Sequence, residues 1–125
     1  MTVTMHGVLI AESLRAGAEL SELPLTVLSL RRVAVSTPAP GQPSAWTLLS
    51  FETDVEPEKL AARFSEVLDT RGWYVDFHTD TEVFVVFAGR VFRYTTGDQS
   101  GRAAAADYAR TMGVPESQLD WGDSD

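Results

Sequence analysis

The chain of 125 residues contains no cysteine. Disulfides, thiolate nucleophiles and zinc sites built from cysteine are therefore excluded. No apolar run is long enough to cross a bilayer, and the N-terminal stretch lacks the basic region of a secretory signal. Because nothing in the sequence points to export, we expect a soluble, cytoplasmic protein.

Basic side chains are scarce and scattered. Lys and Arg total 10 against 18 Asp and Glu, which gives a formal net charge of -8, and the longest basic cluster is Arg31-Arg32. An acidic chain of this kind repels a phosphate backbone, so we expect no nucleic-acid partner. Nearly all the basic residues are arginine and alanine is abundant, a composition typical of GC-rich coding sequences that favours a bacterial source.

The motifs of common catalytic and cofactor sites are also missing. No serine lies in a G-x-S-x-G context, and TTGDQSGR at 95–102 resembles neither a Walker loop nor a dinucleotide fingerprint. The acidic end DWGDSD at 120–125 lacks the ligand spacing of a calcium loop. We therefore expect no cofactor and no bound metal ion.

The residues that are present describe an ordinary globular protein. With 44% hydrophobic and 22% charged residues, the composition is that of one folded domain, which we assign to residues 1–125. Three prolines and a glycine in STPAPGQPSA predict an exposed loop at 36–45 rather than a linker between domains. We expect the acidic tail at 122–125 to fray.

Hydrophobic periodicity predicts the order of the secondary structure. Strand-like patterns occupy 7–13, 25–35 and 46–53, and a helix then begins near Pro57 with an apolar stripe through Leu60, Phe64, Val67 and Leu68. Three more strands at 72–78, 82–88 and 90–96 precede a second helix at 101–113. The order β-β-β-α-β-β-β-α predicts an α+β domain, with a mostly antiparallel sheet of about five to six strands and two helices on one face.

The strand at 83–87 is apolar at every position and therefore needs cover on both sides. If His78 lies opposite Glu82 and Phe87 opposite Val91, the last three strands sort into two faces, although a slip of one residue at 79–81 would reshuffle the first of these strands. One face then carries Trp73, Val75, Phe77, Val83, Val85, Phe87 and Val91. The other carries Tyr74, Phe84, Val86, Phe92 and Tyr94, rimmed by Asp76, His78 and Glu82.

Two helices on one side would leave this second, aromatic face to be covered by something else. Three covers stay open: the first strands of the chain, a second copy or another protein partner, and a small apolar ligand. We therefore expect a small binding or interaction domain without catalysis of its own, which uses the aromatic face to form a homodimer or to hold a partner or ligand. Its binding residues would be Tyr74, Phe84, Val86, Phe92, Tyr94 and His78.

The stretch DFHTDTE at 76–82 allows an alternative. Asp76 and His78 share one face of an extended chain, so His78 could act as a base or metal ligand oriented by Asp76 in a small enzyme or metal-dependent protein. A third metal ligand would have to come from Asp80, Glu82 or His6. The simpler interpretation is that 79–81 form a polar turn with solvated flanks, so an enzyme is the less favoured hypothesis.

Overall fold

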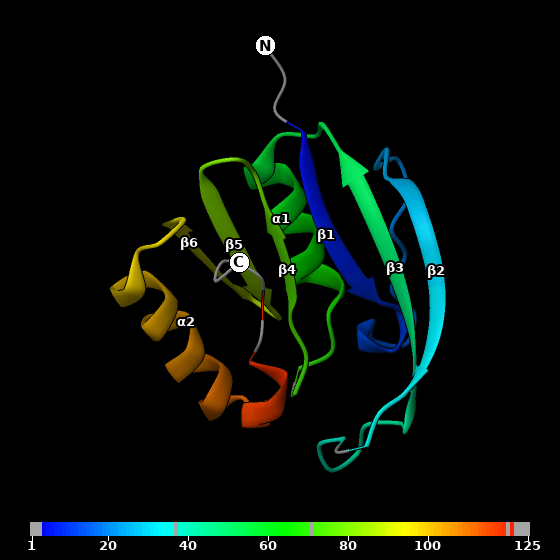
Figure 1. The fold of residues 1–125 in the computed structure, drawn as a ribbon. Helices are drawn as coiled ribbons and strands as arrows, with labels where there is room; N and C mark the ends of the chain where they lie inside the picture. Colours follow the sequence, from blue (N-terminus) through cyan, green and yellow to red (C-terminus); the bar gives the residue numbers. More distant parts are fainter. Residues whose placement is uncertain (1–3, 37, 71, 120, 122–125) are drawn as a thin grey trace.

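The computed structural model describes residues 4–36, 38–70, 72–119 and 121, so the predicted frayed tail at 122–125 lies outside the described residues. Figure 1 shows a sheet with one α-helix on each side. The elements in chain order are β1 (Met5–Ile10), η1 (Ala11–Ser13), β2 (Thr26–Ala34), β3 (Ala45–Thr53), α1 (Pro57–Val67), β4 (Val75–His78), β5 (Glu82–Phe87), β6 (Arg90–Thr95), α2 (Gln99–Thr111) and η2 (Glu116–Gln118). The predicted α+β class and order of elements are confirmed.

The six strands form one antiparallel sheet in the order β2-β3-β1-β4-β5-β6. The first strand is thus internal and separates the N-terminal strands from the C-terminal meander. Gly7, in the middle of β1, has no room for a side chain. A Cβ atom there would lie 2.7 Å from the carbonyl oxygen of Asp76 and 2.8 Å from atoms of both Phe51 and Phe77.

The two helices lie on opposite faces of the sheet, so the prediction that both cover one face is wrong. Leu60 and Phe64 of α1 pack in a core cluster that includes Phe84 of β5. On the other side, Ala105 of α2 packs with Val85 of β5. Alternate side chains of β5 point to opposite faces, and each face receives a helix of its own (Figure 1). The doubly apolar strand is therefore covered on both sides by its own chain.

The predicted register of the meander is also wrong, by one residue at each turn. His78 pairs with Val83 rather than with Glu82, and Phe87 pairs with Arg90 rather than with Val91. In the first turn, the hydroxyl oxygen of Thr79 accepts hydrogen bonds from the backbone N–H groups of Thr81 (3.2 Å) and Glu82 (3.0 Å). These bonds draw Glu82 into the turn, which confirms the interpretation of 79–81 as a polar turn.

The shifted register divides the predicted aromatic face between the two sides of the sheet. Phe84 and Val86 are buried in the cluster under α1, while Phe92 and Tyr94 pack in the cluster that includes α2. Tyr74 also packs against this second cluster. No single surface carries all five side chains.

Local signals explain where the helices begin. Pro57 occupies the first turn of α1, where its missing N–H group costs nothing. The carboxylate of Asp98 caps α2 by accepting hydrogen bonds from the backbone N–H groups of Ser100 (3.1 Å) and Gly101 (3.2 Å). In the part of the chain that the structure describes, neither helix is long and apolar enough to cross a membrane.

The loop at 36–45 is mostly exposed, but it is anchored to the body of the protein at two points. Ala39 is buried, and the side-chain amide of Gln42 donates a hydrogen bond to the carbonyl oxygen of Gly72 (2.7 Å). The same loop also contacts η2. The side chains of Gln42 and Gln118 are linked by a further hydrogen bond of 3.2 Å.

Candidate ligand-binding cleft

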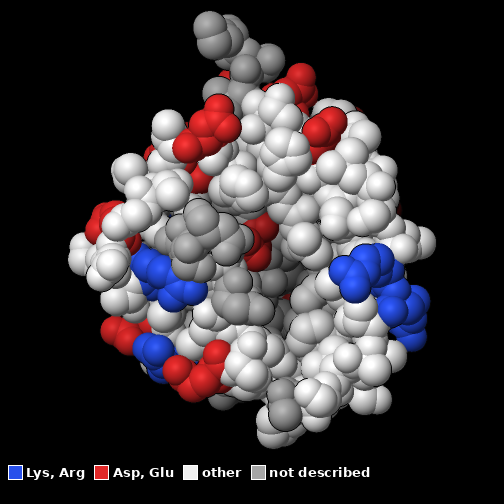
Figure 2. Space-filling view, in the orientation of Figure 1, with Lys and Arg blue, Asp and Glu red and all other residues white. Residues whose placement is uncertain are grey.

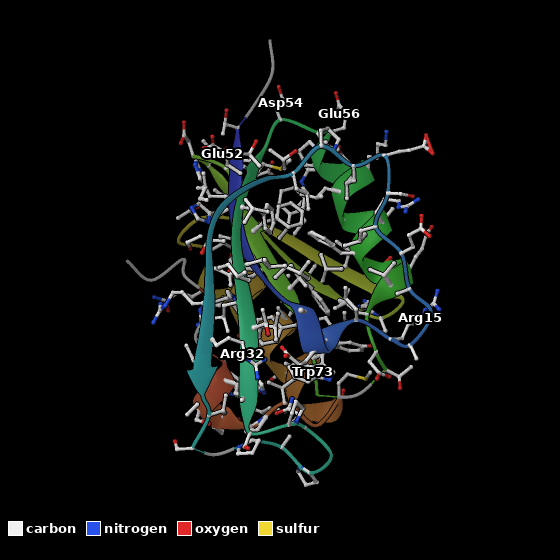
Figure 3. The ribbon with its side chains drawn as sticks, turned by 90° about the vertical axis from the view of Figure 1, so that its right-hand side faces the viewer. Arg15, Arg32, Glu52, Asp54, Glu56 and Trp73 are labelled. Carbon is white, nitrogen blue, oxygen red and sulfur yellow. The ribbon has the colours of Figure 1, made fainter. Side chains whose placement is uncertain are left out.

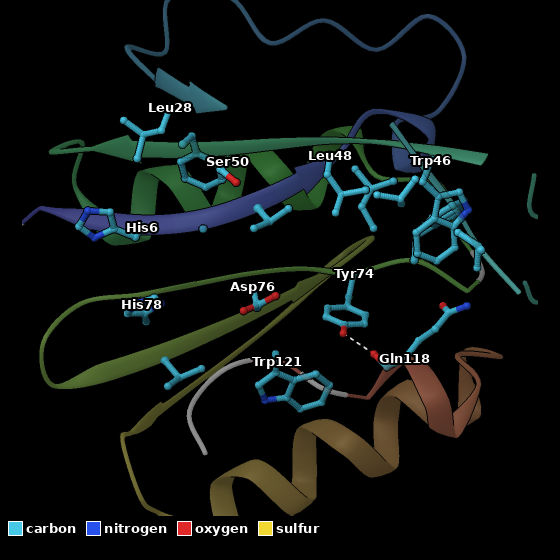
Figure 4. Close-up of a pocket in the computed structure, with 18 of the residues that line it drawn as sticks. His6, Leu28, Trp46, Leu48, Ser50, Tyr74, Asp76, His78, Gln118 and Trp121 are labelled. Carbon is cyan, nitrogen blue, oxygen red and sulfur yellow. Dashed lines mark hydrogen bonds between the residues drawn. The ribbon is translucent and has the colours of Figure 1, made fainter. Parts of the chain in front are cut away.

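A cleft of about 1120 Å³ opens on the α2 side of the sheet. Helix α2 packs over β5 and β6, whereas most residues of β1 and β3 that face the same side belong to the lining of the cleft. Figure 2 shows the hollow near the middle of this face, and Figure 4 shows side chains from β1, β3, β4 and η2 converging on it. The cleft therefore occupies the half of the sheet that α2 leaves uncovered.

The floor of the cleft is apolar and is fixed by the pairing of three strands. Val8 of β1 lies between Ser50 of β3 and Asp76 of β4, and Ile10 of β1 lies opposite Leu48 of β3. Residues directly opposite in an antiparallel pair point to the same face, so these side chains form one surface. Val8 remains 39% exposed, which is unusual for a valine on an internal strand.

All three tryptophans of the chain line the cleft. The ring centroids of Trp46 and Trp73 are 5.1 Å apart, and those of Tyr74 and Trp121 are 5.2 Å apart. The polar atoms of Trp46, Tyr74 and Trp121 are hydrogen-bonded within the protein. The indole N–H group of Trp46 donates to the carbonyl oxygen of Pro43 (2.9 Å), that of Trp121 donates to the Tyr94 hydroxyl (2.7 Å), and the Tyr74 hydroxyl donates to the carbonyl oxygen of Gln118. The walls are therefore aromatic and held in place before any ligand binds.

Two histidines stand at one end of the cleft. His6 of β1 and His78 of β4 lie directly opposite each other, and their ring centroids are 6.1 Å apart. Nε2 of His6 lies 3.1 Å from Oε2 of Glu52. Asp76, two residues before His78, points into the same cavity (Figure 4), and Asp80 also lines it. The structure thus brings His6, Asp76, His78 and Asp80 to one surface.

Glu82, the last residue of the stretch at 76–82, does not lie on the surface that these four side chains share. Its carboxylate accepts hydrogen bonds from the guanidinium group of Arg93 (2.7 and 2.8 Å), on the face that α1 covers. These bonds hold the pKa of the Glu82 carboxyl below its ordinary value, although partial burial opposes the shift. The predicted rim of Asp76, His78 and Glu82 is therefore wrong in its third member.

The described residues include no group of three or more His, Asp or Glu side chains placed to hold a metal ion. His6, His78 and Asp76 share a surface but do not converge on one point. Nothing in this arrangement identifies a reacting group, and the assignment of His78 as a base or ligand oriented by Asp76 stays a prediction.

The sequence-based candidates thus separate into three groups. Tyr74, Asp76 and His78 line the cleft, while Phe84 and Val86 are buried on the opposite side of the sheet. Phe92 and Tyr94 lie beneath α2 rather than in the cleft lining. The sequence analysis missed several lining residues: Val8, Ile10, Trp46, Leu48 and Trp121. The four strand residues come together only through the pairing of β1 with β3, and Trp121 reaches the cleft from the C-terminal segment, neither of which a local pattern predicts.

Comparison with known proteins found no match: no protein-family model, no curated protein and no solved structure is similar to the chain. The function therefore has to be argued from the geometry of the cleft.

Proposed function

We propose that this protein is a binding protein that holds a small, largely apolar molecule in the cleft on the α2 side of its sheet. The observation that carries the proposal is an open apolar floor bounded by all three tryptophans of the chain. Ligand sites in proteins are concave, mostly apolar and aromatic, with a few polar groups that orient the ligand. The cleft has this composition, with Asp76, His78 and Ser50 among its polar groups.

The energetic argument rests on the exposed floor. An apolar side chain that passes from water to full burial gains roughly 1.5–3 kcal/mol. Val8 is still 39% exposed in the free protein, and Leu48 and Ile10 beside it are only partly buried. A ligand that covers these side chains completes their burial without reorganising the strands that hold them, which keeps the entropic cost of binding low.

Tryptophan fluorescence offers a direct test, because every tryptophan of the chain lines the cleft. We expect the neutral aromatic probe N-phenyl-1-naphthylamine to quench the tryptophan emission in a saturable way and to gain fluorescence itself. A probe that binds without changing the tryptophan emission binds elsewhere, and a protein that binds no neutral aromatic probe contradicts the proposal.

Two valines on strands provide a matched pair of variants. Val8 lies on the cleft floor and Val91 on the opposite side of the sheet, and each is 39% exposed. Val8→Gln places an amide against the apolar ligand, and burying a polar group without a partner costs about 1–3 kcal/mol, or roughly 5- to 150-fold in affinity. We expect Val91→Gln to leave the affinity unchanged. Equal effects of the two substitutions would show that the probe does not occupy the floor.

The free edge of the sheet favours a second candidate function, association with a second copy of the chain. Strand β2 ends the strand order, so its outer edge pairs with no strand of the described part of the chain. It carries three of the most exposed large apolar side chains, Val27, Leu28 and Leu30. An exposed edge strand of this kind is a template for pairing with another strand. We therefore place the predicted homodimer at β2 rather than at Phe84 and Val86.

A further inference from the structure

The charged side chains that line the cleft are of one sign. Asp76 and Asp80 belong to the lining, whereas no lysine or arginine does among the residues that the structure describes. In Figure 2 red carboxylate atoms are visible within the hollow, and the blue basic groups of this face lie away from it. The chain as a whole carries a formal net charge of -8, which adds to the same field.

We propose that the ligand of the cleft is an organic cation, namely a protonated or quaternary amine carried on an aromatic or branched apolar body. This inference rests on the proposed function of the cleft and specifies the class of molecule it takes. The apolar body would lie on the floor formed by Val8, Ile10 and Leu48, and the ammonium group would lie beside Asp76.

The position of Asp76 favours a charged partner. Its neighbours across the sheet are Val8 on β1 and Val85 on β5, so the carboxylate is half-buried among apolar side chains. Attraction between opposite charges is stronger at such a site than in open solvent, because the local dielectric is lower. A carboxylate offers about four acceptor positions, so Asp76 can receive an ammonium N–H group in addition to its contacts within the protein.

The aromatic walls supply a second attraction for a cation. An ammonium or guanidinium group within about 6 Å of the centre of an aromatic ring is drawn to the ring face. Trp121 already receives such a group from the protein, since the guanidinium carbon of Arg102 lies 4.9 Å from its ring centroid. Tyr74, next to Asp76 in the cavity (Figure 4), and the pair of Trp46 and Trp73 also belong to the lining.

A ligand with a carboxylate or phosphate group would meet the opposite conditions. The attraction that Asp76 and Asp80 exert on an amine becomes a repulsion, and the described lining provides no lysine or arginine to offset it. The arrangement therefore discriminates between ligands by charge as well as by apolar contact.

Three ligands that share one aromatic body and differ in charge test the inference: 1-naphthylmethylamine, 1-naphthylmethanol and 1-naphthylacetate. Calorimetric titration of the unmodified protein at pH 7.5 is expected to show at least tenfold tighter binding of the amine than of the alcohol, and the weakest binding for the acetate. Adding salt should weaken the binding of the amine and leave the binding of the alcohol unchanged. If the alcohol binds but the amine binds no more tightly, the charge preference is wrong and the proposed binding function stands. If none of the three binds, both are wrong.

A pair of isosteric variants then tests the role of Asp76. We expect Asp76→Asn to remove the preference for the amine over the alcohol, and a far-UV circular dichroism spectrum that matches that of the unmodified protein shows that the variant is folded. Asp54→Asn makes the same change in net charge at an exposed position outside the cleft lining (Figure 3) and should keep the preference. An amine preference that survives Asp76→Asn, or is lost equally in both variants, overturns the assignment of Asp76.

Discussion

Replacing Gly7 by alanine tests the tightest point in the sheet. Gly7 lies in β1, between β3 and β4, and its neighbours in the strand, His6 and Val8, line the cleft. An added Cβ atom would lie 2.7 Å from the carbonyl oxygen of Asp76, 2.8 Å from Cζ of Phe51 and 2.8 Å from Cβ of Phe77. All three distances are well inside the contact distance of about 3.5–4.0 Å at which such atoms attract.

Two opposing contributions determine whether the Gly7→Ala substitution stabilises or destabilises the protein. Gly→Ala substitutions at sites without a clash stabilise a protein by about 0.4–1 kcal/mol, because alanine restricts the unfolded chain. Extra atoms in a close-packed core cost about 1–3 kcal/mol. Only the Phe51 ring can swing aside, since the Asp76 oxygen belongs to the backbone and Cβ of Phe77 is attached to it. We therefore expect the upper end of the cost, and a net loss of about 2 kcal/mol in the free energy of unfolding.

Urea denaturation followed by tryptophan fluorescence measures this loss. With a slope of about 1–3 kcal/mol per molar urea, the midpoint is expected to fall by roughly 1 M. Gly17→Ala is the control, because Gly17 has open space around it and a φ of 86°, so it reports only the conformational cost of the left-handed backbone. A Gly7→Ala variant as stable as the original protein, or more stable, would refute the packing described for β1.

Two further predictions concern the Trp121 wall and the β2 edge. Tyr94→Phe leaves the buried indole N–H group of Trp121 without its acceptor, the Tyr94 hydroxyl at 2.7 Å. We therefore expect the free energy of unfolding, measured by urea titration, to fall by about 1–3 kcal/mol. A loss no larger than that caused by Tyr108→Phe would contradict this prediction. Sedimentation velocity at micromolar concentration is expected to show a dimer that Leu30→Lys dissociates and Val91→Lys does not, and a monomeric unmodified protein would exclude the edge dimer.

The order of the elements could be predicted from the sequence because its signals are local. Pro57 and Asp98 mark the helix starts, and the periodicity of the apolar residues separates helices from strands without reference to the rest of the chain. The apolar run at 83–87 correctly indicated that two covers were needed. These inferences depend on contacts between residues that are close in sequence.

The register and the faces could not be predicted in the same way. A hairpin register depends on which residues the turn absorbs, and the hydroxyl of Thr79 draws Glu82 into the turn, a choice that alternation of apolar residues does not reveal. The cleft depends on contacts between residues still farther apart in the sequence, because β1 lies between β3 and β4. His6 and His78, which are far apart in sequence, become direct neighbours only through this position of β1.

The width of the sheet explains why a cleft opens on one side and not on the other. Six strands spaced about 4.8 Å apart span roughly 24 Å, whereas a helix with its side chains is about 10–12 Å across, so one helix covers about half of each face. On the α1 side, Leu14, Leu20, Leu23 and Leu25 from the segment between η1 and β2 pack against the core and cover the remainder. Figure 3, which looks from the β2 side, shows this segment running past α1. On the α2 side, the described C-terminal residues Leu119 and Trp121 pack with the α2 cluster, and Val8 on β1 stays exposed. A sheet of this width needs a second cover on each face, and the half of the α2 side over which neither described helix packs is the half that the cleft occupies.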